Sequence, residues 1–359
     1  MRYYKMKMKT LVTANIAPRA LNRMRNDLEL EVEYTPISER DGRMGEREFR
    51  EQLADTSVLI VGYEGVSAEI IEEASDLRII ACPRGGPDAN VDIEAATKRG
   101  IPVLYAPGRN AESVADFTWG LIISAMRHIA QSHHLLRTGM YTGTPKADAA
   151  GGGNREDVTW GLGRDSPYEQ LKGTEVGGKT IGIVGFGAVG KEVAKRAVGF
   201  KPDLLGFDPY VDAQKMADYN AEKVELKPLL RRSDVVTVHV PVTESTRGLI
   251  GAAEFALMRE SAYFVNTARA AVIDQKALVN QLQSGSIAGA ALDVYEEEPI
   301  PDDHPLLNLD NVVTTPHLGG ATEEVIGRHS RMLVDDIEAV LNGDRPEHVA
   351  NEDALSTSP

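Results

Sequence analysis

Three glycines follow directly after a strongly apolar, β-branched run at residues 180–184. They lie in the hexapeptide Gly-Phe-Gly-Ala-Val-Gly, residues 185–190, and a helical pattern comes next. This spacing is typical of a dinucleotide-binding turn, in which the glycines permit a tight turn, close approach of a pyrophosphate and close packing of the helix. The phosphates would lie at the helix N-terminus, where free N–H groups favour negative charge. We expect cofactor contacts from Gly185, Gly187, Ala188, Val189 and Gly190.

A carboxylate follows the next predicted strand, at residues 203–207. This residue, Asp208, comes roughly 20 residues after the glycine loop, where such units place the group that binds the adenosine ribose. A carboxylate there accepts hydrogen bonds from the 2′-OH and repels a 2′-phosphate. The pattern therefore predicts NAD rather than NADP, although Asp208 precedes a proline and could instead be a simple turn residue.

Further candidate residues lie at, or just after, the carboxyl ends of four later predicted strands, at 234–240, 262–266, 288–294 and 311–315. Ligands of open α/β sheets bind at the carboxyl ends of the strands. The candidates at these ends are His239, Pro241, Thr246, Thr267, Ala268, Arg269, Asp293, Glu298, His317 and Gly319. The guanidinium of Arg269, the carboxylates of Asp293 and Glu298 and the imidazole of His317 are thus predicted to gather at one edge, beside the glycine loop.

The elements that must position these residues alternate between strands and helices. In the first part of the chain, strands are predicted at 7–13, 57–62, 77–82 and 102–105. A long apolar helix is predicted at 111–136, and an amphipathic helix at 323–341 is expected to pack back onto the first part. This alternation predicts an α/β fold with doubly wound parallel sheets. Residues 142–173 show no clear period, which indicates either an ordered surface loop or a flexible insertion.

Composition excludes several classes of function. The net charge of −15 opposes binding to nucleic acid and to anionic membranes. No apolar run reaches the roughly 20 residues that cross a bilayer, and the N-terminus lacks a secretory signal pattern. The single cysteine, Cys82, excludes an intramolecular disulfide and a cysteine-based metal cluster. We expect a cytoplasmic protein without a metal site, with Cys82 as a buried thiol.

Four segments together resemble the NAD-dependent D-isomer-specific 2-hydroxyacid dehydrogenases, a family that includes phosphoglycerate dehydrogenases. They are residues 185–190, 266–269, 291–299 and 315–320, and the resemblance covers nearly the whole chain apart from 142–173. It implies hydride transfer between NAD(H) and a small D-2-hydroxy acid or its 2-oxo acid. It also implies that Arg269, Glu298 and His317 are the catalytic residues. The cofactor contacts that it implies are Thr246, Thr267, Ala268 and, on the nicotinamide side, Asp293.

These three side-chain types suit the reduction of a 2-oxo acid. The planar guanidinium of Arg269 can hold the carboxylate and polarise the adjacent carbonyl. When hydride adds to C2, His317 can give a proton to the developing alkoxide, and it can take that proton back in the oxidative direction. Glu298 would bond the other ring nitrogen, fix the tautomer and favour the charged form of the ring.

The loop after 77–82 stands where the family uses glycine-rich backbone amides to bind the substrate carboxylate. We expect substrate contacts there from Arg84, Gly85 and Gly86, besides Arg269. The loop departs from the family pattern, because Pro87 replaces a usual glycine and has no N–H to donate. Ala89 replaces a usual aspartate.

The identity of the substrate stays open. Glyoxylate, hydroxypyruvate, phosphoglycerate and other C3–C5 acids are all compatible with the motifs. Tyr63 and Glu64, which follow the predicted strand at 57–62, either line the same cleft or are ordinary loop residues.

The resemblance implies two Rossmann-like domains with a cleft between them. Residues 1–112 and 317–359 would form a discontinuous substrate domain, and residues 113–316 the NAD-binding domain. Closure of the cleft would exclude water around the hydride. The family commonly dimerises through the cofactor domain, so we expect a homodimer that uses the helix at 111–136.

A second class of function stays open. The chain could be an NAD-sensing binding protein, similar to transcriptional corepressors that keep the three catalytic residues and act by recruiting partners. Fold alone does not guarantee turnover. The complete set of Arg269, Glu298 and His317 favours the enzyme. Formate dehydrogenases are disfavoured because a glutamine partners their histidine.

Overall fold

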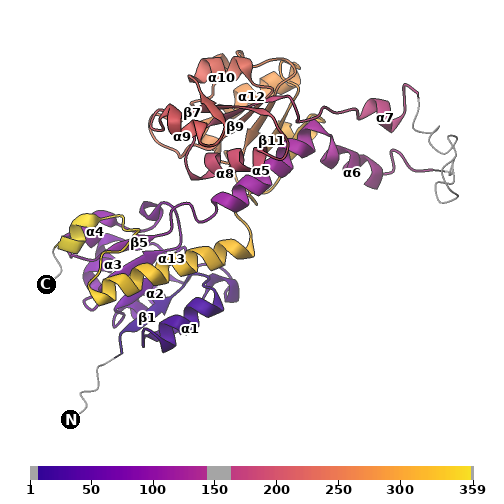
Figure 1. Ribbon diagram of the computed structural model, residues 1–359. Coiled ribbons are helices and arrows are strands. Elements are labelled where there is room, and N and C mark those ends of the chain that lie inside the picture. The colour runs from indigo at the N-terminus through magenta and orange to yellow at the C-terminus, as the bar shows by residue number, and fades with distance from the viewer. Residues whose placement is uncertain (1–6, 144–162, 357–359) are drawn as a thin grey trace, which may run out of the picture. The chain divides into compact units, whose positions relative to one another are not determined.

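The computed structural model describes residues 7–143 and 163–356, which divide into two compact units (Figure 1). The first unit comprises Met1–Arg109 and Ala321–Pro359, and the second comprises Asn110–Gly320. Each unit is built on one sheet in which all paired strands run parallel, so the predicted α/β class is confirmed. No helix within the described residues is long and apolar enough to cross a bilayer.

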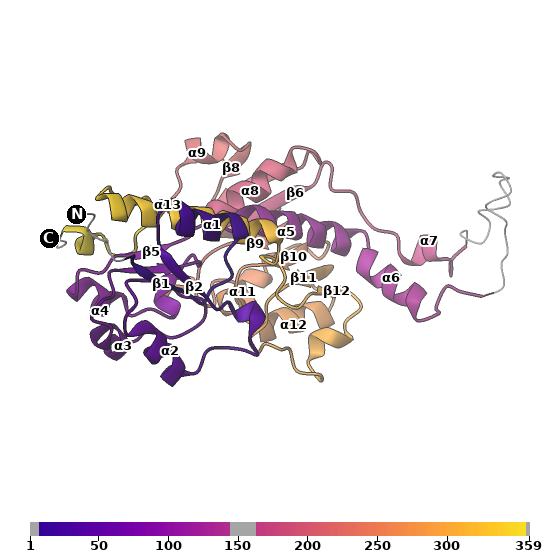
Figure 2. The same cartoon turned by 90° about the horizontal axis from the view of Figure 1, so that it is seen from below.

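The first unit contains a five-stranded sheet in the order β2-β1-β3-β4-β5. Its strands are β1 (Lys9–Val12), β2 (Glu31–Tyr34), β3 (Val58–Ile60), β4 (Ile79–Cys82) and β5 (Val103–Tyr105). Its main helices are α1 (Pro18–Asn26), α2 (Glu46–Leu53), α3 (Ala68–Glu73), α4 (Ile93–Lys98) and α13 (Glu323–Asn342). Strand residues alternate between two cores, so Leu59 packs with α2 and α3 while Ile60 packs with α1 and α13. Figure 2 shows α1 and α13 side by side.

The second unit contains a seven-stranded sheet in the order β12-β11-β10-β9-β6-β7-β8. Its strands are β6 (Thr180–Val184), β7 (Asp203–Phe207), β8 (Ala221–Lys223), β9 (Val235–Val238), β10 (Tyr263–Asn266), β11 (Gly289–Leu292) and β12 (Val312–Thr314). Its helices include α5 (Ala111–Met126), α6 (Ile129–Arg137), α7 (Pro167–Gln170), α8 (Ala188–Ala197), α9 (Ala213–Ala217), α10 (Leu226–Arg232), α11 (Ala252–Phe255) and α12 (Gln275–Gln283). The strand order reverses between β6 and β9, and ligands of open sheets bind at such a switch point.

One predicted helix needs correction, and two strands need to be added. The single helix predicted at 111–136 is wrong, because His128 adopts a left-handed conformation (φ 53°) that separates α5 from α6. The strands β2 and β8 were not predicted. Both lie at sheet edges, where strands are short and polar and the apolar signal is weak. Residues 144–162 of the predicted insertion lie outside the described residues.

Candidate active site

The glycine loop connects β6 to α8 as its spacing predicts. Gly185 has φ 93°, and a Cβ there would lie 2.7 Å from the His239 carbonyl carbon. A Cβ at Gly190 would lie 2.1 Å from the oxygen of Gly185, so α8 packs directly against the turn. A Cβ at Gly187 would meet no atom within 4 Å. The free space is therefore at the N-terminus of α8, where a pyrophosphate can approach the backbone.

Two polar side chains near this loop also fit a dinucleotide. Asp208 lies after β7, and its carboxylate oxygens accept the N–H groups of Phe186 and Tyr210, each at 2.9 Å. This bond to Phe186 fixes the carboxylate beside the glycine loop. The ring of His239 is bonded through Nε2 to Thr237, while its Nδ1 is buried and has no partner within the described residues. Burial lowers the pKa of His239 to about 3, so the ring is neutral and can still make one bond.

Glu298 and His317 lie in direct contact. The Oε2 atom of Glu298 is 2.7 Å from Nδ1 of His317, and its Oε1 atom accepts the N–H of Tyr295 at 3.1 Å. Burial pushes the pKa of Glu298 up, but the bonds from His317 and Tyr295 outweigh it, and the net shift is downward. Glu298 is therefore ionised at neutral pH and orients the ring, which leaves Nε2 of His317 for another partner.

The loop that carries His317 is held by Asp293. This aspartate is 1% exposed, and its carboxylate accepts the hydroxyl of Thr315 at 2.7 Å and the N–H groups of Leu318 and Gly319 at 2.8 Å each. His317 has a left-handed backbone (φ 57°), which is uncommon for a residue with a side chain. The bonds to Asp293 stabilise that turn. The role implied for Asp293 was a cofactor contact, and this bracing of the loop was not predicted.

Arg269 lies at the end of β10, in a turn built by Asn266. The buried Asn266 side chain accepts the N–H of Ala268 at 2.9 Å and donates to the carbonyl of Arg269 at 3.0 Å. The Arg269 guanidinium donates only to the carbonyl of Ala268, at 2.7 Å, among the described residues. It therefore retains donors for an anion. The sequence indicates Asn266 only as part of the segment 266–269. The structure shows that its side chain holds the turn that carries Arg269.

Arg269, Glu298 and His317 line one hollow of about 650 Å³ in the second unit. Arg247 and Tyr295 also line it. The hollow thus brings together a cation that can bind a carboxylate and an imidazole held by a carboxylate. Arg247 was not selected from the sequence. It comes directly after Thr246 in the loop that follows β9.

The remaining predicted cofactor residues of this unit lie in the loops after β9, β10 and β12. The Thr246 hydroxyl donates to the Pro241 carbonyl at 2.6 Å and accepts the N–H of Thr243 at 2.7 Å, so it shapes its own loop. The Thr267 hydroxyl is buried and bonds Thr118 of α5 at 2.9 Å. The hydroxyls of Thr246 and Thr267 thus bond to other protein groups, and their contacts with a cofactor stay a prediction.

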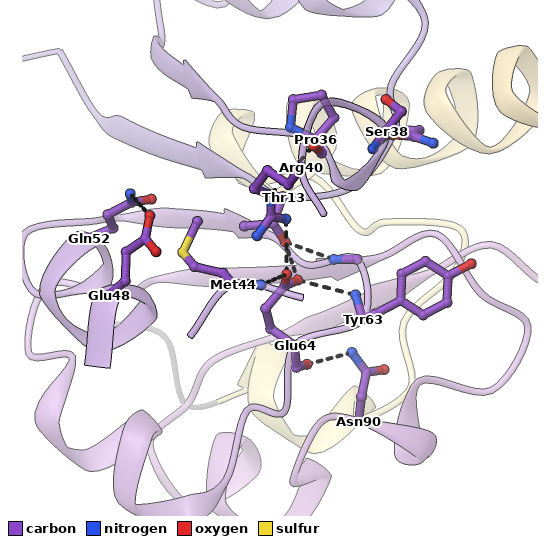
Figure 3. Close-up of polar contacts among 12 residues, drawn as sticks. Thr13, Pro36, Ser38, Arg40, Met44, Glu48, Gln52, Tyr63, Glu64 and Asn90 are labelled. Carbon is purple, nitrogen blue, oxygen red and sulfur yellow. Dashed lines mark hydrogen bonds and ion pairs between the residues drawn. The ribbon is translucent and has the colours of Figure 1, made fainter. Parts of the chain in front are cut away.

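The predicted substrate loop lies in the first unit, at the carboxyl end of β4. Gly85 and Gly86 are exposed there, and Pro87–Ala89 form a single 3-10 turn. The guanidinium of Arg84 stacks over the Tyr63 ring, 4.5 Å from its centre. Glu64, the neighbour of Tyr63, is buried and points into the protein, away from the ring (Figure 3). Tyr63 and Glu64 therefore differ in environment, although the sequence left the same two interpretations open for both.

No group of three or more histidine, cysteine or carboxylate side chains within residues 7–143 and 163–356 is arranged to hold a metal ion. Cys82 is buried, and burial raises the pKa of its thiol to about 11. The thiol is therefore protonated at neutral pH and is a poor nucleophile.

Comparisons with known proteins show which sequences and structures this chain is similar to. A family model described as "D-isomer specific 2-hydroxyacid dehydrogenase, NAD binding domain" matches residues 119–319. The D-3-phosphoglycerate dehydrogenase of Methanocaldococcus jannaschii is 39% identical over 85% of this chain and 53% of its own length. The glyoxylate reductase of Korarchaeum cryptofilum is 36% identical over 99% of each chain. Among solved structures, the TT0316 protein from Thermus thermophilus superimposes with a TM-score of 0.78 and 32% identity, covering 96% of this chain and 100% of that chain.

The chain spans about half the length of the D-3-phosphoglycerate dehydrogenases that it matches, and nearly the full length of the glyoxylate reductase.

Proposed function

This chain belongs to the D-isomer specific 2-hydroxyacid dehydrogenase family, and we propose that it transfers hydride between NAD(H) and a small D-2-hydroxy acid or its 2-oxo acid. The observation that carries the proposal is the hollow that Arg269 shares with the Glu298–His317 pair. A carboxylate site beside a proton donor is what reduction of a 2-oxo acid requires.

In this proposal, each of the three residues has a separate role. Arg269 binds the substrate carboxylate and polarises the carbonyl. His317 holds a proton at Nε2, gives it to the alkoxide that forms at C2, and takes it back in oxidation. Glu298 accepts the Nδ1–H bond and stabilises the imidazolium. NAD(H), when bound, supplies or accepts the hydride at C2.

We assign cofactor binding to the second unit. The open space at Gly187 and the unpartnered Nδ1 of His239 support this assignment. Asp208 is proposed to accept the ribose 2′-OH, which favours NAD over NADP because a carboxylate repels a 2′-phosphate. Its fixed position beside the glycine loop supports that role.

The substrate is proposed to be a small 2-oxo acid of two or three carbons. The full-length match to a glyoxylate reductase and the partial match to a D-3-phosphoglycerate dehydrogenase support this size. Arg84, Gly85 and Gly86 remain predicted substrate contacts of the first unit, which we propose to be the substrate domain.

We also propose that the protein is a cytoplasmic homodimer. Helix α6 buries none of its own residues, and its Ile129 and Leu136, together with Met140 just beyond its end, are at least half exposed. An apolar face of this kind favours association, and we propose a second copy of this chain as its partner. Sedimentation of wild type and of a Leu136→Glu variant tests it: a dimer that the variant dissociates supports the homodimer, and a monomeric wild type overturns it.

The loss of NADH absorbance with a panel of 2-oxo acids tests the proposed reaction. The panel contains glyoxylate, hydroxypyruvate and 3-phosphohydroxypyruvate, with NADPH in parallel. Turnover of one acid with NADH supports the proposal. Bound NADH with no turnover of any acid would instead favour an NAD-sensing protein.

A further inference from the structure

Glu64 is a buried carboxylate in the first unit, outside the hollow described above. Glu64 is 3% exposed and lies in the loop after β3. Four donors surround the carboxylate in Figure 3: the hydroxyl of Thr13 at 2.6 Å, the guanidinium of Arg40 at 3.0 Å, and the N–H groups of Tyr63 at 3.2 Å and Met44 at 3.3 Å. Burial raises its pKa, but these bonds outweigh burial and the net shift is downward. The group is therefore a fixed negative charge at neutral pH.

The bonds to Glu64 fix the backbone at Tyr63 and at the residue before it, Gly62. One carboxylate oxygen accepts both the Tyr63 N–H and the Thr13 hydroxyl, and the Thr13 oxygen in turn accepts the N–H of Gly62 at 2.9 Å. Gly62 passes so close that a Cβ there would lie 3.0 Å from the Thr13 carbonyl oxygen. Tyr63 consequently leaves the sheet in a fixed direction, although its own side chain is 47% exposed.

The same segment is tied to the predicted substrate loop. The backbone carbonyl of Glu64 accepts the side-chain N–H of Asn90 at 2.9 Å (Figure 3). The N–H of Val66 also donates to the Asn90 carbonyl, at 2.7 Å. On the other side, the Tyr63 ring supports the guanidinium of Arg84 at 4.5 Å. Stacking on a ring occupies the face of a guanidinium and leaves its N–H edge free. Within the described residues, Arg84 forms no ion pair with a carboxylate, so this edge is available to an anion.

A buried ion pair is a weak way to stabilise a fold, because apolar side chains of similar volume often do as well. What the charge of Glu64 does uniquely is to gather donors from three separate segments around the base of Tyr63. We propose that Glu64 is a positioning residue for substrate binding, which holds Tyr63 so that its ring presents Arg84 to the anionic 2-oxo acid. This inference rests on the proposed function, since it needs Arg84 to contact the substrate.

Steady-state kinetics with glyoxylate and with hydroxypyruvate, at saturating NADH, test the inference in a double-mutant cycle. Glu64→Gln and Arg84→Met are each expected to raise KM for the acid roughly 5- to 20-fold, because each weakens or removes the contact between the Arg84 guanidinium and the carboxylate of the acid. The kcat and the KM for NADH should change less than about twofold. The double variant should be no worse than Arg84→Met alone, because Glu64 acts through Arg84.

A matched control separates positioning from general stability. Asp336 is also a buried carboxylate of the first unit, and it accepts N–H groups of Glu347 and His348. Asp336→Asn should lower the melting temperature and leave KM unchanged. Tyr63→Ala, at an exposed side chain, keeps the test valid if Glu64→Gln does not fold. It should raise KM as Arg84→Met does, while Tyr63→Phe keeps the ring and should raise KM less than Tyr63→Ala does.

Some outcomes overturn the inference and leave the reaction standing. In the first, wild type turns over the acid, but KM is unchanged in Glu64→Gln or in Tyr63→Ala. In the second, Glu64→Gln raises KM by the same factor in wild type and in Arg84→Met. Absence of wild-type turnover with every acid overturns both the proposed function and this inference.

Discussion

Nδ1 of His317 and Oε2 of Glu298 lie 2.7 Å apart, while Oε1 of the same carboxylate accepts the N–H of Tyr295. A backbone N–H of its own loop thus holds the Glu298 carboxylate, independently of the bond to the imidazole. The lowered pKa of Glu298 keeps its carboxylate ionised at neutral pH. The pair therefore sets both the tautomer and the orientation of the ring.

Glu298→Gln should lower kcat about 10- to 100-fold, because the amide can present its NH₂ group to Nδ1 and no longer stabilises the imidazolium. NADH binding should be unaffected. Stopped-flow reduction of the acid and NADH titration by fluorescence measure the two quantities. Equal losses in both would contradict the orienting role.

Asp293→Asn should destabilise the protein by about 2–3 kcal/mol, because bonds from Thr315, Leu318 and Gly319 to a buried charged acceptor are weakened or lost. The His317 loop should also loosen, so kcat should fall with stability. Urea unfolding and kcat measured on the same preparation check this expectation. Full stability with reduced NADH affinity would instead support a cofactor contact only.

Asp208→Ala should reduce the preference for NADH over NADPH, expressed as the ratio of kcat/KM values, at least roughly 10-fold. The variant removes the charge that repels a 2′-phosphate. Asp212→Ala is a suitable control, since Asp212 caps α9 through the N–H of Lys215. An unchanged preference in Asp208→Ala would remove Asp208 from the ribose site.

The stability that Glu64 contributes should depend on pH. Its pKa in the folded protein is below the ordinary value of 4.5, so the unfolded chain takes up the proton first as pH falls. The contribution is therefore complete above pH 4.5 and is lost as pH falls through the lowered folded value. Glu64→Gln should cost about 3 kcal/mol at pH 7, and this difference should shrink at acid pH. A difference that stays constant down to about pH 3 would refute the assignment.

Features encoded over short distances could be predicted from the sequence. Gly185–Gly190 combine turn and helix signals within six residues, and the loops after the strands follow from the order of the sheet. The sequence placed Arg269, Glu298 and His317 at one sheet edge, and the structure brings them into one hollow. Their catalytic roles stay predictions.

Features that depend on distant segments could not be predicted. The burial of Glu64 requires Thr13, Arg40 and Met44, which lie 51, 24 and 20 residues before it in the sequence. The break between α5 and α6 rests on one left-handed residue, His128, inside an otherwise continuous helical pattern. The bracing of the His317 loop depends on a long-range contact with Asp293, and nothing in the local sequence distinguishes that contact from a cofactor bond.

The central claim is that His317 is the proton donor in reduction of a 2-oxo acid by NADH. The most direct test is kcat and the NADH dissociation constant of His317→Gln, measured with the acid that wild type reduces fastest. We predict a fall in kcat of about 10²- to 10⁴-fold with NADH binding within twofold of wild type. A near-normal kcat would contradict the account.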